Sequence, residues 1–331
     1  MIDYFSRENI FLAWREFSRG KRRRTDIKKF EHRAEENVKN IHEELSSGNY
    51  RHKGYVQFQI LDQKRRSIST ASVNDRIIHH LVYTYLVEHC DKSFYFHSYS
   101  SRISKGTDKA RNSVKKIFRK SSKNFTKEVW VLKCDVRKFF ASVDHAKLLQ
   151  LLRNKINDDN VYIITKQIVN SYNPQNTNTG LPLGNVTSQI FANIYLNELD
   201  YYLKQTIGVK NYIRYNDDFL VISNSRDELQ KIYNKAFHYC SNYLGVHLKN
   251  VYIRKLSWGV DFLGHRFYPY RELLIPKVLK QIRQRYLEMS SNHKQGIMHD
   301  EYLLSAHNSY TGMCKNIHGN PLPLIDNFNT H

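Results

Sequence analysis

The sequence predicts an α+β fold, in which helices cover one face of an antiparallel sheet. Strand-like apolar stretches lie at residues 129–136, 212–222 and 251–256, and amphipathic helical stretches separate them. The first strand runs into Asp135, and the second is interrupted by the pair Asp217-Asp218. Acidic residues at the ends of two strands indicate one functional edge, provided that the two strands are neighbours.

The regions before these strands have a helical pattern broken by one hairpin. The first 50 residues are mostly helical in pattern, with a basic cluster inside them. Residues 55–71 predict a β-hairpin with a basic tip, because apolar positions alternate on both sides of a polar turn. Residues 73–90 have apolar positions at helical spacing, and the last sixty residues are basic and largely helical in pattern.

The charge of the chain favours a polyanionic partner. In 331 residues there are 52 Lys and Arg against 31 Asp and Glu, which gives a formal net charge of +21. An excess of this size favours nucleic acid through phosphate contacts and counterion release. A basic protein of the membrane surface is the alternative, but no basic amphipathic helix with a clean apolar face supports it, and no membrane is expected as a partner. The four dispersed cysteines indicate reduced thiols, and the expected location is the cytoplasm.

Asp217 and Asp218 lie where a tight turn is expected. The residue types Asn216-Asp217 favour a hairpin turn, which carries the carboxylates to a sheet edge. If Asp135 ends a neighbouring strand, three carboxylates converge there, and such a group of oxygen ligands suits Mg²⁺. The alternative is a solvated Asp-Asp turn with an unrelated aspartate elsewhere.

Six motifs, in order between residues 30 and 269, resemble those of reverse transcriptases. YNDD resembles the YxDD box of that family, and LKCDVRKFFASVDH is similar to its first catalytic aspartate motif. GLPLGNVTSQIFANIYLNELD resembles the loop and helix that position template and nucleotide, and DFLGHRF resembles the primer grip. KRRSIST with DRIIHH, and SYSSRISKGTDKA, are similar to the fingers motifs.

The resemblance implies a right-hand polymerase fold and RNA-directed DNA synthesis. We expect N-terminal helices and fingers at residues 1–125, a palm at 126–265 with a loop and helix at 180–205, and a short basic thumb at 266–331. The implied cofactors are two Mg²⁺ per active site, with Mn²⁺ as a substitute. The implied substrates and partners are deoxynucleoside triphosphates, an RNA template and the cDNA product. The alternative is a catalytically idle RNA-binding scaffold on the same fold.

A variant in the loop and helix motif indicates which subgroup of reverse transcriptases the sequence resembles. Leu183-Gly184 and Ser188-Gln189 stand where many reverse transcriptases have Gln-Gly and Ser-Pro. This variant resembles the enzymes of diversity-generating retroelements and a related bacterial group that includes antiphage defence proteins. The resemblance therefore implies a structured noncoding RNA as template, together with an accessory protein or a homo-oligomer.

The resemblance also implies a role for individual residues around the metals. Asp135 and Asp217 would bridge the two ions, with Asp218 as a weaker ligand and the carbonyl of Val136 as a further one. Lys249 is the nearest match to the lysine that protonates the leaving pyrophosphate, although it is one position off the pattern.

Substrate contacts follow from the same motifs. Residues expected to contact the nucleotide are Lys64, Arg66, Phe140, Leu183, Gly184 and Gln189; those expected at the template or primer are Arg102, Lys105, Phe262, Leu263 and Gly264. Phe140 would act as a steric gate against a ribose, whereas Phe139 would lie in the core. The alternatives are a solvated basic turn at residues 64–66 and an exposed basic loop at 102–105.

Overall fold

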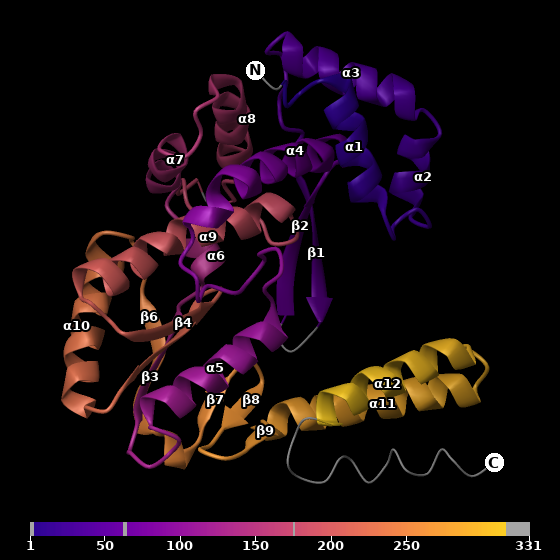
Figure 1. Ribbon diagram of the computed structural model, residues 1–331. Helices are drawn as coiled ribbons and strands as arrows, with labels where there is room; N and C mark the ends of the chain where they lie inside the picture. The colour runs from indigo at the N-terminus through magenta and orange to yellow at the C-terminus, as the bar shows by residue number, and fades with distance from the viewer. Residues whose placement is uncertain (1–2, 62–64, 175, 316–331) are drawn as a thin grey trace.

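The secondary structure is that of a mixed helix and sheet protein. The structure is a computed structural model, and it describes residues 3–61, 65–174 and 176–315 (Figure 1). The N-terminal part comprises α1 (Arg7–Ser18), α2 (Thr25–Glu31), α3 (Ala34–Ser46), β1 (Tyr55–Leu61), β2 (Arg65–Ala71), α4 (Val73–Cys90) and α5 (Thr107–Ser121). The central part comprises β3 (Trp130–Val136), α6 (Phe139–Ser142), α7 (His145–Arg153), α8 (Asp159–Asn170), α9 (Val186–Tyr201), β4 (Asn211–Tyr215), β5 (Asp218–Ser223), α10 (Arg226–Asn242) and β6 (Leu248–Lys255). The C-terminal part comprises β7 (Val260–Phe262), β8 (His265–Phe267), β9 (Glu272–Leu274), α11 (Pro276–Lys294) and α12 (Asp300–Lys315).

A four-stranded antiparallel sheet carries the predicted acidic residues. Its strand order is β4-β5-β3-β6, so that β3 lies between the YNDD hairpin and β6. The register of β3 and β5 places Asp135 directly opposite Asp218. The two strands on whose contact the sequence argument depended are therefore neighbours.

Helices cover both faces of this sheet, which corrects the expectation that they cover one. On one face the strand residues Leu132 and Phe219 belong to the large core that α9 and α10 also form. On the other face Leu220 packs in a second core with Val114 and Phe118 of α5. The small sheet β7-β8-β9 joins α5 on that second face.

The hairpin and the last two helices extend from the body of the molecule. β1 and β2 pair antiparallel from Tyr55–Ala71 to Leu61–Arg65, as the alternating pattern predicts. Figure 1 shows this hairpin projecting below the N-terminal helices, on the side toward which α11 and α12 extend from β7-β8-β9. The helix predicted at residues 73–90 is α4, and it begins there because the Ser72 hydroxyl accepts the backbone N–H of Asp75 at 3.1 Å. In the described part of the chain, no helix combines the length and the apolar character needed to cross a bilayer.

Candidate active site

The acidic residues lie on a two-residue hairpin turn. Tyr215 of β4 pairs with Asp218 of β5, which leaves Asn216 and Asp217 as the turn residues. Asn216 has a φ of +56°, a left-handed conformation that asparagine tolerates better than most residues. The residue type that departs from the usual motif thus suits the backbone at this position.

Asp135 and Asp217 are brought together at the end of β3. The backbone N–H of Val136 donates to the carbonyl of Asp217 at 3.2 Å, which ties the turn to β3. One oxygen of Asp135 accepts the side-chain amide of Asn250 at 3.0 Å and lies 3.4 Å from the ammonium of Lys249. Lys249, which sequence resemblance placed here only approximately, is therefore next to the acidic pair.

The carboxyl groups of Asp217 in the turn and Asp218 in β5 hold their protons more tightly than a solvated aspartate. Burial, together with the charge of Asp135, raises the pKa of Asp217 to about 6. Burial also raises the pKa of Asp218 to about 7, although the ammonium of Lys133 opposes this rise. Negative charge concentrated at a sheet edge is costly in the absence of a cation, and this cost is typical of metal and catalytic sites.

Asp218 is oriented differently from the other two aspartates. One of its oxygens accepts a hydrogen bond from the Lys133 ammonium at 2.8 Å, and Lys133 also donates to the carbonyl of Asp261 at 2.9 Å. Among the described residues, its other oxygen is buried and has no hydrogen-bond partner. Because Lys133 holds one of its two oxygens, the weaker metal-ligand role expected for Asp218 stays a prediction.

The donor set left by this arrangement fits a hard divalent cation. Among the described residues, no three Asp, Glu, His or Cys side chains are grouped closely enough to hold a metal ion. Mg²⁺, however, commonly takes only one or two carboxylates and completes its shell with water and substrate phosphates. Asp135 and Asp217 supply those carboxylates, and the raised pKa of Asp217 shows that a cation would relieve an unfavourable charge.

A buried ion pair that sequence reasoning missed supports the turn from behind. The guanidinium of Arg214 is fully buried and donates to Asp200 of α9 at 2.8 Å, to the hydroxyl of Ser98 at 3.1 Å and to the carbonyl of Asn216 at 3.0 Å. The Tyr212 hydroxyl donates to the same carboxylate at 2.7 Å. A charged residue inside an otherwise apolar strand was the signal in the sequence, since a buried guanidinium requires an acidic partner.

Comparison with known proteins identifies the family. Residues 52–267 match the family described as reverse transcriptase (RNA-dependent DNA polymerase). This range contains β3, the YNDD turn and the loop before α9. The chain belongs to the reverse transcriptase family.

Individual relatives agree with this assignment. The chain is 26% identical over 180 residues to the group II intron-encoded protein LtrA of Lactococcus lactis, which covers 52% of this chain and 29% of LtrA. It is 23% identical over 269 residues to the protein YkfC of Escherichia coli, covering 68% and 70% of the two chains. A third relative is an uncharacterized 91 kDa protein in the cob intron of Schizosaccharomyces pombe, 27% identical over 145 residues, which covers 42% of this chain and 17% of that protein.

A solved structure shares the fold. The telomerase of Candida albicans, solved with a fragment of telomeric RNA, matches with a TM-score of 0.53 at 10% identity, covering 73% of this chain and 51% of that one. This likeness agrees with the right-hand polymerase fold that the motifs predict.

The loop that contains Leu183 and Gly184 packs on the hairpin of β1 and β2. The carbonyl of Leu183 accepts the backbone N–H of Ser69 in β2 at 2.9 Å. Gly184 has a φ of +109°, and a Cβ there would lie 2.7 Å from the Ile68 side chain, so that glycine is required by both space and conformation. Gln189, at the start of α9, accepts a hydrogen bond from the Ser101 hydroxyl at 3.0 Å. These contacts fix the loop between hairpin and palm.

The adjacent phenylalanines after β3 have separate environments. Phe139 is buried in the large core, as predicted, whereas Phe140 is only half-buried. The carbonyl of Phe140 accepts the backbone N–H of Leu181 at 2.6 Å. This bond places Phe140 beside the loop that contains Leu183 and Gly184.

Two of the basic residues expected at the template are held by the protein itself. The Arg102 side chain is 6% exposed; it pairs with Asp91 at 2.7 Å and donates to the carbonyls of Tyr95 and Ser98. Its expected contact with template is therefore wrong, because its donors already hold the loop. Lys105 donates to the carbonyl of Phe96 at 2.7 Å and is half-buried.

The segment expected to grip the primer is partly core. Phe262 is buried in the second core, so its ring cannot contact a primer as expected. Leu263 and Gly264 form the turn between β7 and β8, with φ values of +52° and +80°. The half-buried turn, not the aromatic ring, is the more accessible part of this motif.

Two of the residues expected to contact the nucleotide, through its triphosphate, lie at the edge of what the structure describes. Lys64 lies outside the described residues. Arg66 pairs with Ile60 in the backbone register of β1 and β2, but its side chain also lies outside what is described. The expected contacts of both with a triphosphate stay predictions.

Proposed function

We propose that this chain is an RNA-directed DNA polymerase that extends a primer on an RNA template. The observation that carries the proposal is the apposition of Asp135 and Asp217 at the junction of β3 and the YNDD turn, where burial and mutual repulsion raise the pKa of Asp217. An idle RNA-binding scaffold gains nothing from this arrangement, since the unrelieved charge lowers its stability.

In this proposal the chain supplies a charged, preorganised site. Bound Mg²⁺ would activate the primer hydroxyl and stabilise the triphosphate leaving group. Asp135 and Asp217 would hold the cations, and Asn250 and Lys249 orient the carboxylate of Asp135 through the contacts described above. Lys133 holds Asp218 and so keeps one negative charge compensated beside the metal site.

Primer extension by the purified chain tests this proposal. We expect Mg²⁺-dependent extension of a DNA primer on an RNA template, which stops with a chelator and resumes with added Mg²⁺ or Mn²⁺. Asp135→Asn is expected to remove it, while exposed Asp159→Asn on α8 leaves it intact. Binding of RNA with no extension under any metal, by a folded protein, would instead support the idle scaffold.

Phe140 gives a further prediction about the sugar of the substrate. The half-buried ring of Phe140 lies beside the loop that contains Leu183 and Gly184, where it can exclude a ribose 2′-hydroxyl. We therefore expect Phe140→Ala to incorporate ribonucleotides more efficiently, relative to deoxyribonucleotides, by on the order of 10- to 100-fold. The measurement is the ratio of kcat/KM for the two substrates. Phe139→Leu, in the core next to it, is the control and should leave this ratio unchanged. An unchanged ratio in Phe140→Ala would show that Phe140 does not act as a steric gate.

The biological setting is proposed from the motif variant at Leu183-Gly184 and Ser188-Gln189. We infer a bacterial retroelement or antiphage defence system with a dedicated noncoding RNA. Sequencing the cDNA that copurifies with the protein tests this: products from one RNA locus are expected, whereas products drawn from cellular RNA at large would contradict a dedicated template.

A further inference from the structure

Helix α5 is strongly basic. Its sequence, TDKARNSVKKIFRKS, contains six Lys and Arg and one acidic residue. One side of α5 packs in the second core through Val114 and Phe118, Arg111 is half-buried, and most of its remaining residues are exposed. The predicted function uses none of these basic residues, although α5 begins beside the catalytic turn, where the Thr107 and Tyr215 hydroxyls lie 3.2 Å apart.

A groove of about 750 Å³ follows one side of α5, and we call it the lysine groove. The basic residues that line it are Lys105, Lys109, Lys116, Lys120 and Lys210. No acidic side chain is among its described lining residues. Lys116, Lys120 and Lys210 are exposed and have no ion-pair partner in the described ranges, so their charges are uncompensated.

The spacing of these lysines suits an extended ligand. Lys109, Lys116 and Lys120 stand at i, i+7 and i+11, which places them on one face of the helix. At 1.5 Å per residue they span about 16 Å, several times the size of one phosphate group. The partner implied by this row is therefore a chain of phosphates, not a single small anion.

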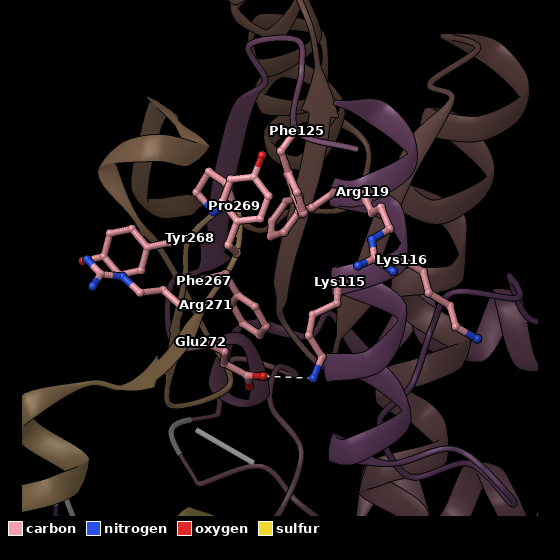
Figure 2. A pocket seen from close by; sticks show the side chains of 11 residues that line it. Lys115, Lys116, Arg119, Phe125, Phe267, Tyr268, Pro269, Arg271 and Glu272 are labelled. Carbon is pink, nitrogen blue, oxygen red and sulfur yellow. Dashed lines mark ion pairs between the residues drawn. The ribbon is translucent and has the colours of Figure 1, made fainter. Parts of the chain in front are cut away.

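A second groove, of about 350 Å³, lies on the other side of α5, and we call it the aromatic groove. Figure 2 shows Lys115 and Arg119 of α5 facing the segment from Phe267 to Glu272 across it. Lys116 lines both grooves, so they meet at α5. Among the described lining residues of the aromatic groove, Glu272 is the single acidic one. Its charge is compensated by Arg111 at 2.6 Å and Lys115 at 3.1 Å.

Exposed aromatic rings stand in both grooves. Phe96 is 68% exposed in the lysine groove, with the Lys105 ammonium 3.8 Å from its ring. Tyr270 is 78% exposed in the aromatic groove and packs edge-on against Phe125 at 4.9 Å. Exposed rings beside unpaired cations are the combination with which proteins bind single-stranded nucleic acid, because bases stack on the rings while the cations contact phosphates.

We propose that α5 with its two grooves is a binding track for a single-stranded nucleic acid that leads away from the metal site. Lys109, Lys116 and Lys120 contact successive phosphates, and Phe96 and Tyr270 stack bases. The track begins near the catalytic turn and leads away from it, since Lys210 and Asn211, which line the lysine groove, lie at the opposite end of β4, about 13 Å along the strand from the turn. It extends the proposed function by naming a second site for the nucleic acid partner, but it does not require polymerisation.

Binding of labelled single strands as a function of salt tests the track. The triple variant Lys109→Gln/Lys116→Gln/Lys120→Gln is expected to bind a 20-nucleotide RNA at least 10-fold more weakly at 150 mM salt. Its log–log salt slope should be less steep by about 2, since each phosphate contact on a single strand contributes about 0.7. Phe96→Ala/Tyr270→Ala should weaken binding with the slope unchanged, because stacking releases no counterions.

Matched controls separate the track from general charge and from catalysis. Lys231→Gln/Lys235→Gln removes two exposed lysines from α10 and should change affinity less than 2-fold. Asp217→Asn should bind like the unaltered protein, so that a failure of the polymerase proposal leaves this test intact. Extension of a short preannealed primer–template by the triple variant should keep its kcat.

The outcomes decide both the site and the strand. Equal losses for RNA and DNA strands assign the shared phosphate backbone, and a loss confined to RNA assigns an RNA strand that is read through its 2′-hydroxyls. If neither strand loses affinity in the triple variant, or if the α10 control loses as much, the track is overturned. Circular dichroism of each variant checks that it is folded.

Discussion

Asp217→Asn should abolish primer extension and at the same time stabilise the metal-free protein above pH 7. Activity is lost because the turn no longer offers a carboxylate to the cations beside Asp135. Stability rises because the pKa of Asp217, about 6, lies above that of an unfolded aspartate, so ionisation of the folded protein has a cost that Asn removes. We expect a gain of roughly 2 kcal/mol in the free energy of unfolding at pH 8.

The pH dependence follows from the same pKa. The folded state binds the proton of Asp217 more tightly than the unfolded state does, so this group stabilises the protein below about pH 4, and the contribution is lost as the pH rises through about 6. The gain from Asn should therefore vanish near pH 4. Added Mg²⁺ should raise the melting temperature of the unaltered protein at pH 8 but not that of the variant. If the variant is less stable at pH 8 than the unaltered protein, ionised Asp217 does not destabilise the metal-free fold, and the explanation is refuted.

Arg214→Met should destabilise the protein by about 3–5 kcal/mol, because it leaves the buried Asp200 without a counter-charge. It also removes the hydrogen bond from the guanidinium to the carbonyl of Asn216, which supports the catalytic turn. Denaturant unfolding measures the first effect. Arg153→Met is the matched control, since Arg153 and its partner Asp159 are 49% and 77% exposed and such pairs contribute at most about 1 kcal/mol.

The positioning role of Arg214 is tested by Arg214→Lys. Lysine keeps the charge beside Asp200 but cannot reach Ser98, Asp200 and the turn carbonyl at once with a planar fork. We expect kcat to fall at least 10-fold while KM for the nucleotide changes little, because the turn is displaced without loss of substrate contacts. A kcat equal to that of the unaltered protein in a folded Arg214→Lys variant would leave Arg214 with a structural role alone.

The sequence predicts the catalytic edge because local rules and family motifs agree there. Asn216 suits a turn, apolar residues flank it, and a strand end at Asp135 supplies the partner; the register of β3 and β5 then joins them. The hairpin β1–β2 and the helix α4 are predictable for the same reason, since periodicity and a Ser72 cap define them locally.

Features that depend on tertiary partners could not be read in the same way. Arg102 and Lys105 belong to one basic motif, yet only the fold shows that Asp91 and nearby carbonyls hold Arg102. Lys133 lies two residues before Asp135 in β3, so the two side chains are on the same face of the strand. This spacing does not show that Lys133 pairs with Asp218, which only the fold reveals. The cover that α5 gives the second sheet face depends on a contact between segments that are far apart in the sequence.

Anomalous diffraction from crystals grown with Mn²⁺ and a primer–template is the most direct test of the metal site. We expect Mn²⁺ peaks in contact with the carboxylates of both Asp135 and Asp217, and no such peaks in crystals of Asp135→Asn. Mn²⁺ bound at another place, with these two carboxylates free of metal while a primer end lies beside them, would contradict this expectation.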